Sequence, residues 1–441
     1  MLKKTVAVLG STGSVGTQTL QVAKHLGYNV CALTAHGNYK LLEIQAREFS
    51  PDSVWIGEDN YVNLKTALAD TRIKVLTGEN ALCELARDAK CDIVCNSLLG
   101  LSGLLPTLAA IEGGHDIALS NKEVLVAGGS IVTARAKEKG IKILPVDSEH
   151  SAIFQCMGGR KPSRIYLTAS GGPFFGKDAG FLKTVTPQMA LAHPNWNMGA
   201  KITVDSATMM NKGLEIIEAV WLFGVKPQDI EVLVHRESIV HSMVGFEDNS
   251  VIAQLARPDM RLCIQYALTY PDRVPSLTPA PDLCELGSLT FSRPDTETFP
   301  LLELARRAIE KGGSMPAAMS GANEEAVALF LKGAIGFTDI FTLVSEAAYG
   351  VPFARLPTSA ICAKRIARRG NTCFPPAKGD NYVNQYLFVR MDHPRNGLHF
   401  RDPYNDTRAR PLSGGARVQG GHTRIFRGHG ARHTHLEMQD Q

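Results

Sequence analysis

A run in the middle of the chain combines the side chains needed to hold a phosphorylated ligand. Residues 205–215 include a hydroxyl, an amide, an ammonium and a carboxylate, on Ser206, Asn211, Lys212 and Glu215. Asp205 or Ser206 is expected to cap a helix whose free backbone N–H groups attract an anion. Asn211 and Glu215 lie one turn apart on that helix. If this run is considered alone, an ordinary capped amphipathic helix is the better explanation. The further motifs described below favour a phosphate-binding site beside a metal ligand.

Two more carboxylates follow a short apolar strand. Asp147 and Glu149 stand in Val-Asp-Ser-Glu-His and project to the same side if the chain stays extended. Together with Glu215 they predict an all-oxygen site, which suits Mg²⁺ or Mn²⁺ rather than zinc. A solvated acidic turn is the usual explanation of an isolated Asp-x-Glu.

The tetrapeptide 120–123, Ser-Asn-Lys-Glu, follows the apolar strand 117–119. Ligands bind at the carboxyl ends of strands in a doubly wound sheet, so Asn121, Lys122 and Glu123 are expected near both nicotinamide and substrate. The alternative is a polar cap on a helix that begins at Glu123.

A glycine loop indicates a nucleotide site near the N-terminus. Gly10-Ser-Thr-Gly-Ser-Val-Gly16 follows a predicted strand and opens a predicted helix, as a variant of the dinucleotide fingerprint. The second strand ends in Thr-Ala-His-Gly-Asn (34–38) without the acidic residue that binds the ribose of NAD. This absence favours NADP(H).

Glycine-containing motifs bracket a long connection that we interpret as a lid, the loop 170–200. Residues 169–174 read Ala-Ser-Gly-Gly-Pro-Phe and residues 193–199 read His-Pro-Asn-Trp-Asn-Met-Gly. Glycines at both ends are candidate hinges, while Trp196 and Met198 would cover a polar substrate and His193 would supply a donor. A tryptophan that packs a rigid loop explains the same residues about as well.

The pattern along the chain predicts an α/β protein in several parts. Short aliphatic runs alternate with helical patterns over the first ~130 residues, which indicates a Rossmann-like doubly wound sheet. Strands are expected at 5–9, 29–34, 53–56, 93–95, 116–119 and 142–146, and helices at 15–26, 39–49 and 104–111. An α+β catalytic region follows, with strands at 164–168, 231–234 and 251–255. A Pro- and Gly-rich linker spans 273–300. Helices at 301–311, 322–332 and 339–348 then begin an incomplete helical bundle. The predicted domains are 1–148, 149–272 and 301–349, and a divergent tail, 350–441, follows them.

Composition separates this tail from the rest. The 441 residues carry a net charge of +4, but beyond Gly350 there are 15 Lys and Arg against six Asp and Glu, a net +9. The preceding 350 residues carry a net −5. Apolar periodicity disappears at the same point, so we expect a disordered tail and hypothesise out-of-frame translation or a foreign extension.

No membrane or secretory segment is expected. No apolar run approaches the ~20 residues of a membrane span. The nine cysteines show no pairing pattern, so we expect reduced thiols and a cytoplasmic protein.

Taken together, the motifs closely resemble 1-deoxy-D-xylulose 5-phosphate reductoisomerases, NADPH-dependent enzymes of the non-mevalonate isoprenoid pathway. Six motifs occur in the family's order over residues 1 to about 348: the glycine loop, Asn-Lys-Glu, Val-Asp-Ser-Glu-His, Ser-Gly-Gly-Pro-Phe, His-Pro-Asn-Trp and the run 204–215. Family members continue into further helices, whereas this match dissolves by about Gly350.

The resemblance implies a role for each matching residue. Lys122, Glu149 and His193 would be catalytic, and Asp147, Glu149 and Glu215 would bind the divalent metal. The cofactor would contact Thr12, Gly13, Ser14, Val15, Gly37, Asn38, Asn121, Glu123, Gly199 and Met260. The substrate would contact Lys122, Ser148, Glu149, Ser170, His193, Trp196, Ser206, Asn211, Lys212 and Glu215.

The implied reaction converts 1-deoxy-D-xylulose 5-phosphate to 2-C-methyl-D-erythritol 4-phosphate. The carbon skeleton rearranges by retro-aldol cleavage and re-addition, and NADPH then delivers a hydride; the family is dimeric, which implies a homodimer. Three alternatives stay open: an inactive homologue that only binds NADPH, another NADP-linked dehydrogenase, or a fusion whose tail binds nucleic acid. The metal set argues against the second. The third is disfavoured because the tail lacks aromatic residues placed regularly among its basic ones.

Overall fold

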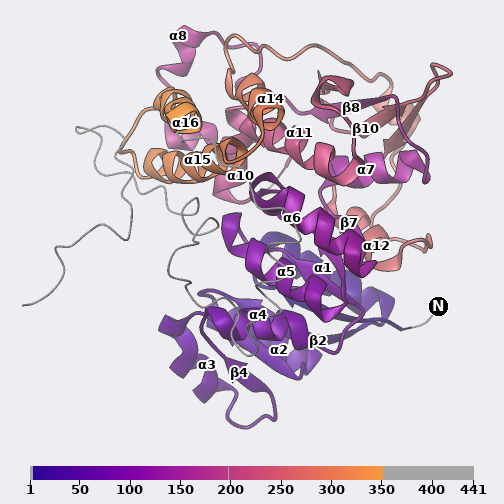
Figure 1. Cartoon of the computed structure of the whole chain (residues 1–441), viewed down its shortest axis with the longest axis vertical. Helices are drawn as coiled ribbons and strands as arrows, with labels where there is room; N and C mark the ends of the chain where they lie inside the picture. The colour runs from indigo at the N-terminus through magenta and orange to yellow at the C-terminus, as the bar shows by residue number, and fades with distance from the viewer. Residues whose placement is uncertain (1–2, 197, 351–441) are drawn as a thin grey trace, which may run out of the picture. The chain divides into compact units, whose positions relative to one another are not determined.

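The computed structural model describes residues 3–196 and 198–350 (Figure 1). Seven parallel strands form its first sheet in the order β4-β3-β2-β1-β5-β6-β7. The strands are β1 (Thr5–Leu9), β2 (Asn29–Ala35), β3 (Ser53–Ile56), β4 (Lys74–Leu76), β5 (Ile93–Asn96), β6 (Asp116–Leu119) and β7 (Ile143–Pro145). The connecting helices are α1 (Ser14–Leu26), α2 (Tyr39–Phe49), α3 (Tyr61–Ala67), α4 (Glu79–Asp88), α5 (Leu104–Gly113) and α6 (Glu123–Lys139), with short 3₁₀ turns at Glu58–Asn60 and Gly100–Gly103. This doubly wound arrangement confirms the Rossmann-like prediction.

Helices cover both faces of this sheet, which explains the nearly continuous aliphatic runs in its strands. Val6 and Val8 of β1 belong to one buried cluster, while Ala7 and Leu9 belong to the cluster on the opposite face. Helix α12 (Met260–Thr269) also packs on the first of these faces through Ile264 and its neighbours, although it lies far along the chain.

A second sheet has four strands in the order β11-β10-β8-β9. Strands β8 (Arg164–Ala169) and β9 (Ile230–Val234) are parallel, and β10 (Val240–Gly245) pairs antiparallel with both β8 and β11 (Val251–Leu255). The associated helices are α7 (Ser148–Met157), α8 (Ala179–Leu182), α9 (Pro187–Ala190), α10 (Ala200–Ala207) and α11 (Met210–Phe223), with a 3₁₀ turn at Pro227–Asp229.

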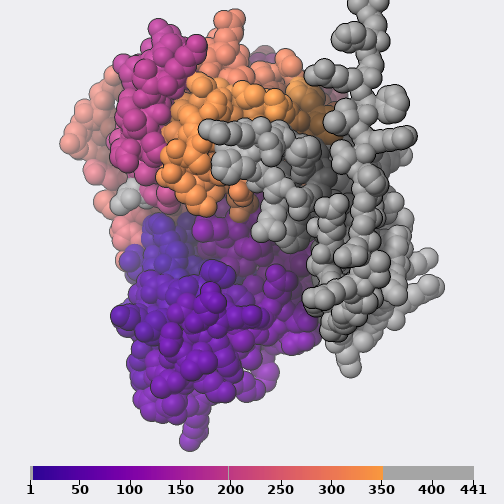
Figure 2. Space-filling view, turned by 90° about the vertical axis from the view of Figure 1, so that its left-hand side faces the viewer, coloured from indigo at the N-terminus to yellow at the C-terminus, as the bar shows by residue number. Residues whose placement is uncertain are grey.

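Three helices, α14 (Leu301–Lys311), α15 (Met315–Leu331) and α16 (Asp339–Gly350), follow the short α13 (Leu283–Leu286). They share one buried cluster with α11 and the second sheet. Phe337 links the two parts, because its ring lies 5.3 Å from that of Phe174 and 5.6 Å from that of Phe330. Figure 2 shows α15 and α16, in orange, beside the magenta segment around α8.

Most of the predicted elements are confirmed, and six are exact: the strands 5–9, 53–56, 116–119 and 251–255 and the helices 39–49 and 301–311. The prediction missed β4, which has only three residues, and β10, whose polar His241 and Ser242 interrupt the aliphatic run. It also began α15 seven residues late, because Met315-Pro316 and the small residues after it hide the start of that helix.

Within the described residues, no helix is long and apolar enough to cross a membrane. The predicted tail, 350–441, lies outside the described residues except for Gly350, as does Asn197 in the predicted lid.

Candidate active site

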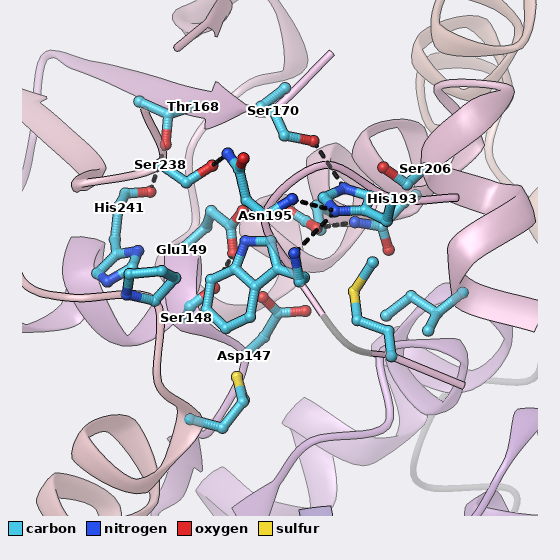
Figure 3. Close-up of a pocket in the computed structure, with 18 of the residues that line it drawn as sticks. Asp147, Ser148, Glu149, Thr168, Ser170, His193, Asn195, Ser206, Ser238 and His241 are labelled. Carbon is cyan, nitrogen blue, oxygen red and sulfur yellow. Dashed lines mark hydrogen bonds between the residues drawn. The ribbon is translucent and has the colours of Figure 1, made fainter. Parts of the chain in front are cut away.

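A cavity of about 460 Å³ lies where the carboxyl ends of the first sheet meet the second region (Figure 3). Most of the predicted site residues line it: Ser14, Val15, Lys122, Asp147, Ser148, Glu149, Ser170, His193, Trp196, Gly199, Ser206, Asn211, Lys212, Glu215 and Met260. Segments that are far apart in the sequence therefore form a single site.

The three predicted metal ligands converge in this cavity. Asp147, Glu149 and Glu215 each offer a carboxylate oxygen, and these oxygens all lie within 4.8 Å of one another. The predicted route to this convergence is wrong: the strand ends at Pro145, and Glu149 lies in the first turn of α7. Asp147 occupies the position before that helix, with a ψ of 134°, so the chain bends into the helix instead of staying extended.

Two lysines neutralise the carboxylate cluster. Nζ of Lys122 lies 2.5 Å from Asp147 and 3.0 Å from Glu215. Nζ of Lys212 lies 2.8 Å from Glu149 and 2.6 Å from Glu215. Because both ammonium groups are nearly inaccessible to solvent, they replace the hydration that the buried carboxylates have lost.

Burial and charge together shift the pKa values of these groups. Burial and the negative charge of Glu215 raise the pKa of Glu149 to about 7. Burial alone would raise the pKa of Asp147, but the charge of Lys122 holds it well below its usual value. The pKa of Lys122, lowered by burial, is raised well above normal by Asp147 and Glu215. The cluster thus joins carboxylates of unequal proton affinity, an arrangement typical of functional sites.

A bound divalent cation fits this donor set. Three carboxylate oxygens within 4.8 Å, with no sulfur ligand among them, match the hard-oxygen preference of Mg²⁺ and Mn²⁺. A dication would supply the positive charge that the two lysines now provide.

On one side of the cluster lie the polar groups predicted to hold phosphate. Asn211 and Lys212 stand on the first turn of α11, and Nδ2 of Asn211 donates to Glu215 at 2.6 Å. The predicted helix cap is wrong: Asp205 is an interior residue of α10, where it pairs with Lys201 at 2.7 Å and accepts from Asn323 at 2.8 Å. The break falls instead at Met209, whose φ of 62° separates α10 from α11.

The turn after β8 reaches the same side of the cavity. Gly171 and Gly172 have φ values of 76° and 64°, a left-handed conformation that favours glycine. A Cβ on Gly172 would lie 2.7 Å from the carbonyl oxygen of Ser206, so the two segments approach too closely for any larger residue. This approach brings Ser170 and Ser206 to one wall of the cavity.

His193, in the predicted lid, contacts this turn. Its Nε2 lies 3.0 Å from Oγ of Ser170, and its Nδ1 accepts from the backbone N–H groups of Asn195 and Trp196 (Figure 3). Two donors to Nδ1 require the remaining proton to be on Nε2. Burial, with the charge of Arg236, lowers the pKa of His193 to about 4. The ring is therefore a neutral donor to Ser170.

The predicted dinucleotide loop has the expected geometry. It leaves β1 and enters α1, with Thr12 partly exposed and Gly13 and Ser14 exposed beside the helix N-terminus. A Cβ on Gly16 would lie 2.2 Å from the carbonyl oxygen of Gly10. This packing keeps the N-terminus of α1 open to an anion, so a pyrophosphate fits.

Other predicted cofactor residues lie outside the cavity lining. Gly37 and Asn38 are exposed after β2, where Oδ1 of Asn38 caps α2 by accepting from Leu41 N–H. Nδ2 of Asn121 donates to the carbonyl groups of Leu98 and Gly100. Glu123 is paired with Lys201, and although burial opposes ionisation, this ammonium holds the pKa of Glu123 below its usual value.

Two histidines, one behind the cavity and one in its lining, received no role from the sequence. Fully buried His150 lies 3.5 Å from Glu218 and its Nε2 contacts the carbonyl of Glu215 at 2.9 Å, so it packs directly behind the carboxylates. Burial lowers the pKa of His241 to about 4. His150 is the last residue of the recognised Val-Asp-Ser-Glu-His motif and His241 lies in the missed strand β10, so only their positions in three dimensions identify them.

Comparison with known families agrees with this geometry. A model of 1-deoxy-D-xylulose 5-phosphate reductoisomerase matches residues 6–129, and one of its C-terminal domain matches residues 143–223. A further model, the DXP reductoisomerase C-terminal domain, matches residues 255–366. The match thus extends past residue 348, where we expected it to end.

Similar proteins of this name cover most of the chain. The reductoisomerase of Bacteroides fragilis is 48% identical over 378 residues, which cover 83% of this chain and 97% of the relative. That of Symbiobacterium thermophilum is 51% identical over 354 residues, covering 78% of this chain and 91% of the relative.

Solved structures give the same result. The enzyme from Zymomonas mobilis in complex with NADPH is 42% identical with a TM-score of 0.76, covering 83% of this chain and 97% of that one. A DOX-P reductoisomerase in complex with NADPH, fosmidomycin and magnesium is 41% identical with a TM-score of 0.76, covering 78% and 89%. The chain therefore belongs to the 1-deoxy-D-xylulose 5-phosphate reductoisomerase family.

Proposed function

We propose that this protein converts 1-deoxy-D-xylulose 5-phosphate to 2-C-methyl-D-erythritol 4-phosphate, using NADPH and Mg²⁺ or Mn²⁺. The observation that carries the proposal is the convergence of Asp147, Glu149 and Glu215 beside a hydroxyl- and lysine-lined wall of one cavity. Hydride transfer alone needs no such carboxylate cluster, whereas rearrangement of a sugar skeleton benefits from a polarised carbonyl.

The phosphate of the substrate is assigned to the wall made by Ser170, Ser206, Asn211 and Lys212. Serine hydroxyls and a side-chain amide donate hydrogen bonds, while Lys212 adds a positive charge. Because the phosphate itself takes no part in the rearrangement, its binding energy orients the ketose and favours lid closure. His193 and Trp196 cover the substrate from the lid side.

The reacting oxygens are assigned to the neighbourhood of Lys122, Ser148 and Glu149. When bound, the divalent cation polarises the substrate carbonyl and NADPH supplies the hydride. Lys122 donates to substrate oxygen and stabilises negative charge that develops there. Glu149, whose pKa is raised to about 7, is suited to accept and return a proton near neutral pH, with Ser148 as its hydrogen-bond partner.

The cofactor is assigned to the face of the cavity below the lid. Thr12, Gly13, Ser14 and Val15 would hold the diphosphate at the N-terminus of α1. Met260 and Gly199, which line the cavity, would contact the nicotinamide part. Asn121 and Glu123 would contact the cofactor from the edge of the cavity. Gly37 and Asn38 would lie near the adenosine end of the cofactor.

Assembly and location extend the proposal. We expect a cytoplasmic homodimer, with 1–148 as the NADPH domain, 149–272 as the catalytic domain, 273–300 as a linker and 301–349 as the helical domain. Edge strand β11 supports the dimer, because Val251 and Ile252 remain 49% and 38% exposed there.

The decisive experiment follows NADPH absorbance with 1-deoxy-D-xylulose 5-phosphate, in Mn²⁺ or Mg²⁺ and then with chelator. Turnover that chelation abolishes and metal restores is the expected result. Turnover without metal would indicate a simple dehydrogenase. A folded protein that binds NADPH but shows no turnover would be an inactive homologue.

A further inference from the structure

An arginine outside the predicted set contacts the segments that form the phosphate wall. Nη1 of Arg236 donates to the carbonyl oxygen of Ser170 at 2.6 Å and to that of Gly172 at 2.8 Å. Its guanidinium carbon also lies 5.3 Å from the centre of the Phe175 ring. One side chain therefore spans the turn from Ser170 to Phe175.

The backbone of the same residue contacts the lid. Nδ2 of Asn195 donates to the carbonyl oxygen of Arg236 at 2.5 Å and to Oγ of Ser238 at 2.8 Å (Figure 3). The turn 235–238 between β9 and β10 thus joins two otherwise separate segments, the Ser170 turn and the lid.

These contacts determine where Ser170 can donate. Oγ of Ser170 accepts from the Gly172 N–H at 3.2 Å and, given the tautomer derived above, from the Nε2–H of His193 at 3.0 Å. Both of its acceptor positions are therefore used within the protein. The hydroxyl hydrogen is left to donate into the cavity, which is the direction that a phosphate oxygen requires.

The turn would not hold this geometry by local preference alone. Two successive left-handed glycines, Gly171 and Gly172, carry no side chains that lock the turn, and glycine retains the most backbone freedom when unfolded. The carbonyls of Ser170 and Gly172 point toward a single guanidinium group, which is the group that satisfies them. Arg236 also places a positive charge near the wall, as its effect on the pKa of His193 indicates.

We propose that Arg236 is a positioning residue of the phosphate subsite: it holds the Ser170–Gly172 turn and, through its backbone, the lid. The proposal rests on the function assigned above, because it presupposes that this wall binds the phosphate. Arg236 does not line the cavity itself and need not touch the ligand.

The test measures phosphate affinity, which does not depend on turnover. Inorganic phosphate is titrated against the full chain with NADPH and Mg²⁺ present, and NADPH affinity is measured separately by fluorescence. In Arg236→Met, which keeps an apolar stem over Phe175, we expect phosphate affinity to fall by about tenfold, the size of one charge-assisted hydrogen bond. NADPH affinity stays within about twofold of wild type, because the glycine loop lies elsewhere.

The matched control is Arg164→Met, at the opposite end of β8, where the guanidinium of Arg164 makes an exposed 3.5 Å pair with Glu231 and no other ion pair within the described part of the chain. Its phosphate affinity is expected to equal that of wild type. If Arg236→Met does not fold, Arg236→Lys carries the test, since it keeps the charge but cannot reach both carbonyls in the same way.

Unchanged phosphate affinity in the folded Arg236 variant overturns the proposal, as does an equal loss of NADPH affinity, which would indicate a general structural defect. Two outcomes separate it from the proposed function. Wild-type protein that binds phosphate but does not turn over the sugar phosphate contradicts the function alone. Wild-type protein that binds no phosphate contradicts the subsite and this proposal together.

Discussion

The imidazole of His193 is a hydrogen-bond donor to Ser170, with Nε2 3.0 Å from Oγ. The direction follows from the other ring nitrogen, which accepts from the backbone N–H groups of Asn195 and Trp196. A pKa of about 4, lowered by burial and by Arg236, keeps this ring neutral over the physiological range. The proposed lid is thus connected to the proposed phosphate wall by a bond that does not titrate near neutral pH.

The first prediction concerns His193→Ala. Losing this donor and the acceptor for two lid N–H groups should raise KM for the sugar phosphate by about tenfold, while KM for NADPH changes little. In wild type, KM should also show no titration of this histidine between pH 6 and pH 8. Steady-state kinetics across that range tests both statements.

His25→Ala is the control, because His25 is exposed and, within the residues that the structure describes, its ring hydrogen-bonds only to the carbonyl of Pro275. A wild-type KM that titrates near pH 6.5, with the titration lost in His193→Ala, would show that the ring is charged there and that the tautomer assignment is wrong.

A second prediction concerns the carboxylate cluster. Asp147→Asn should weaken Mn²⁺ binding on the order of 100-fold, since a neutral amide replaces one of three anionic ligands. Because protons compete for Glu149, whose pKa is raised to about 7, wild-type Mn²⁺ affinity should also fall as the pH drops below 7. Electron paramagnetic resonance of free Mn²⁺ measures both effects without turnover.

Glu79→Gln, which alters an exposed carboxylate in the first turn of α4, should bind Mn²⁺ as wild type does. If Asp147→Asn also retained full affinity, the ion would have to bind elsewhere on the protein.

Sequence patterns and the family resemblance were sufficient for the fold, and most of the predicted site residues lie in one cavity. Strands such as Thr5–Leu9 have both faces buried and read as aliphatic runs, so their bounds were exact. The grouping of Asp147, Glu149 and Glu215 was also foreseen, although the argument from an extended chain was wrong, because Glu149 and Glu215 lie on helices.

The local conformations were harder to foresee, because tertiary contacts determine them. Aspartate is a common residue type at helix caps, but Asp205 pairs with Lys201 and Asn323 and lies inside α10. Met209 adopts a left-handed φ that its residue type does not favour. Arg236 left no signal at all, since its role depends on backbone carbonyls of a turn more than 60 residues away.

A third prediction concerns the glycine loop. Gly16→Ala should destabilise the protein and weaken NADPH binding by at least about tenfold, because its Cβ would lie 2.2 Å from the Gly10 carbonyl and displace the loop. Gly321→Ala is the matched control: it lies in α15 with nothing within 4 Å of the added Cβ. That variant should be slightly more stable, since alanine favours helix. Thermal unfolding measures the stability of both variants, and NADPH fluorescence measures their cofactor affinity. Equal behaviour of the two variants would contradict the close packing of Gly16 against Gly10.

The last prediction concerns His241, which is 3% exposed and whose pKa is lowered by burial to about 4. The unfolded chain binds a proton at this residue near pH 6.5, whereas the folded protein does so only near pH 4. Between these values the unfolded state holds more protons, so the free energy of unfolding must fall as the pH is lowered. Over the whole interval, protonation of His241 lowers the free energy of unfolding by about 3 kcal/mol.

His241→Gln removes this titration while keeping a polar side chain of similar length. Other groups, such as Glu149, titrate in the same interval, so the informative quantity is the difference between variant and wild type. We expect the free energy of unfolding of wild type minus that of the variant to be smaller at pH 5 than at pH 7.5. Both free energies are measured by urea unfolding. A difference that does not vary with pH would mean that His241 is protonated, or solvated, in the folded protein.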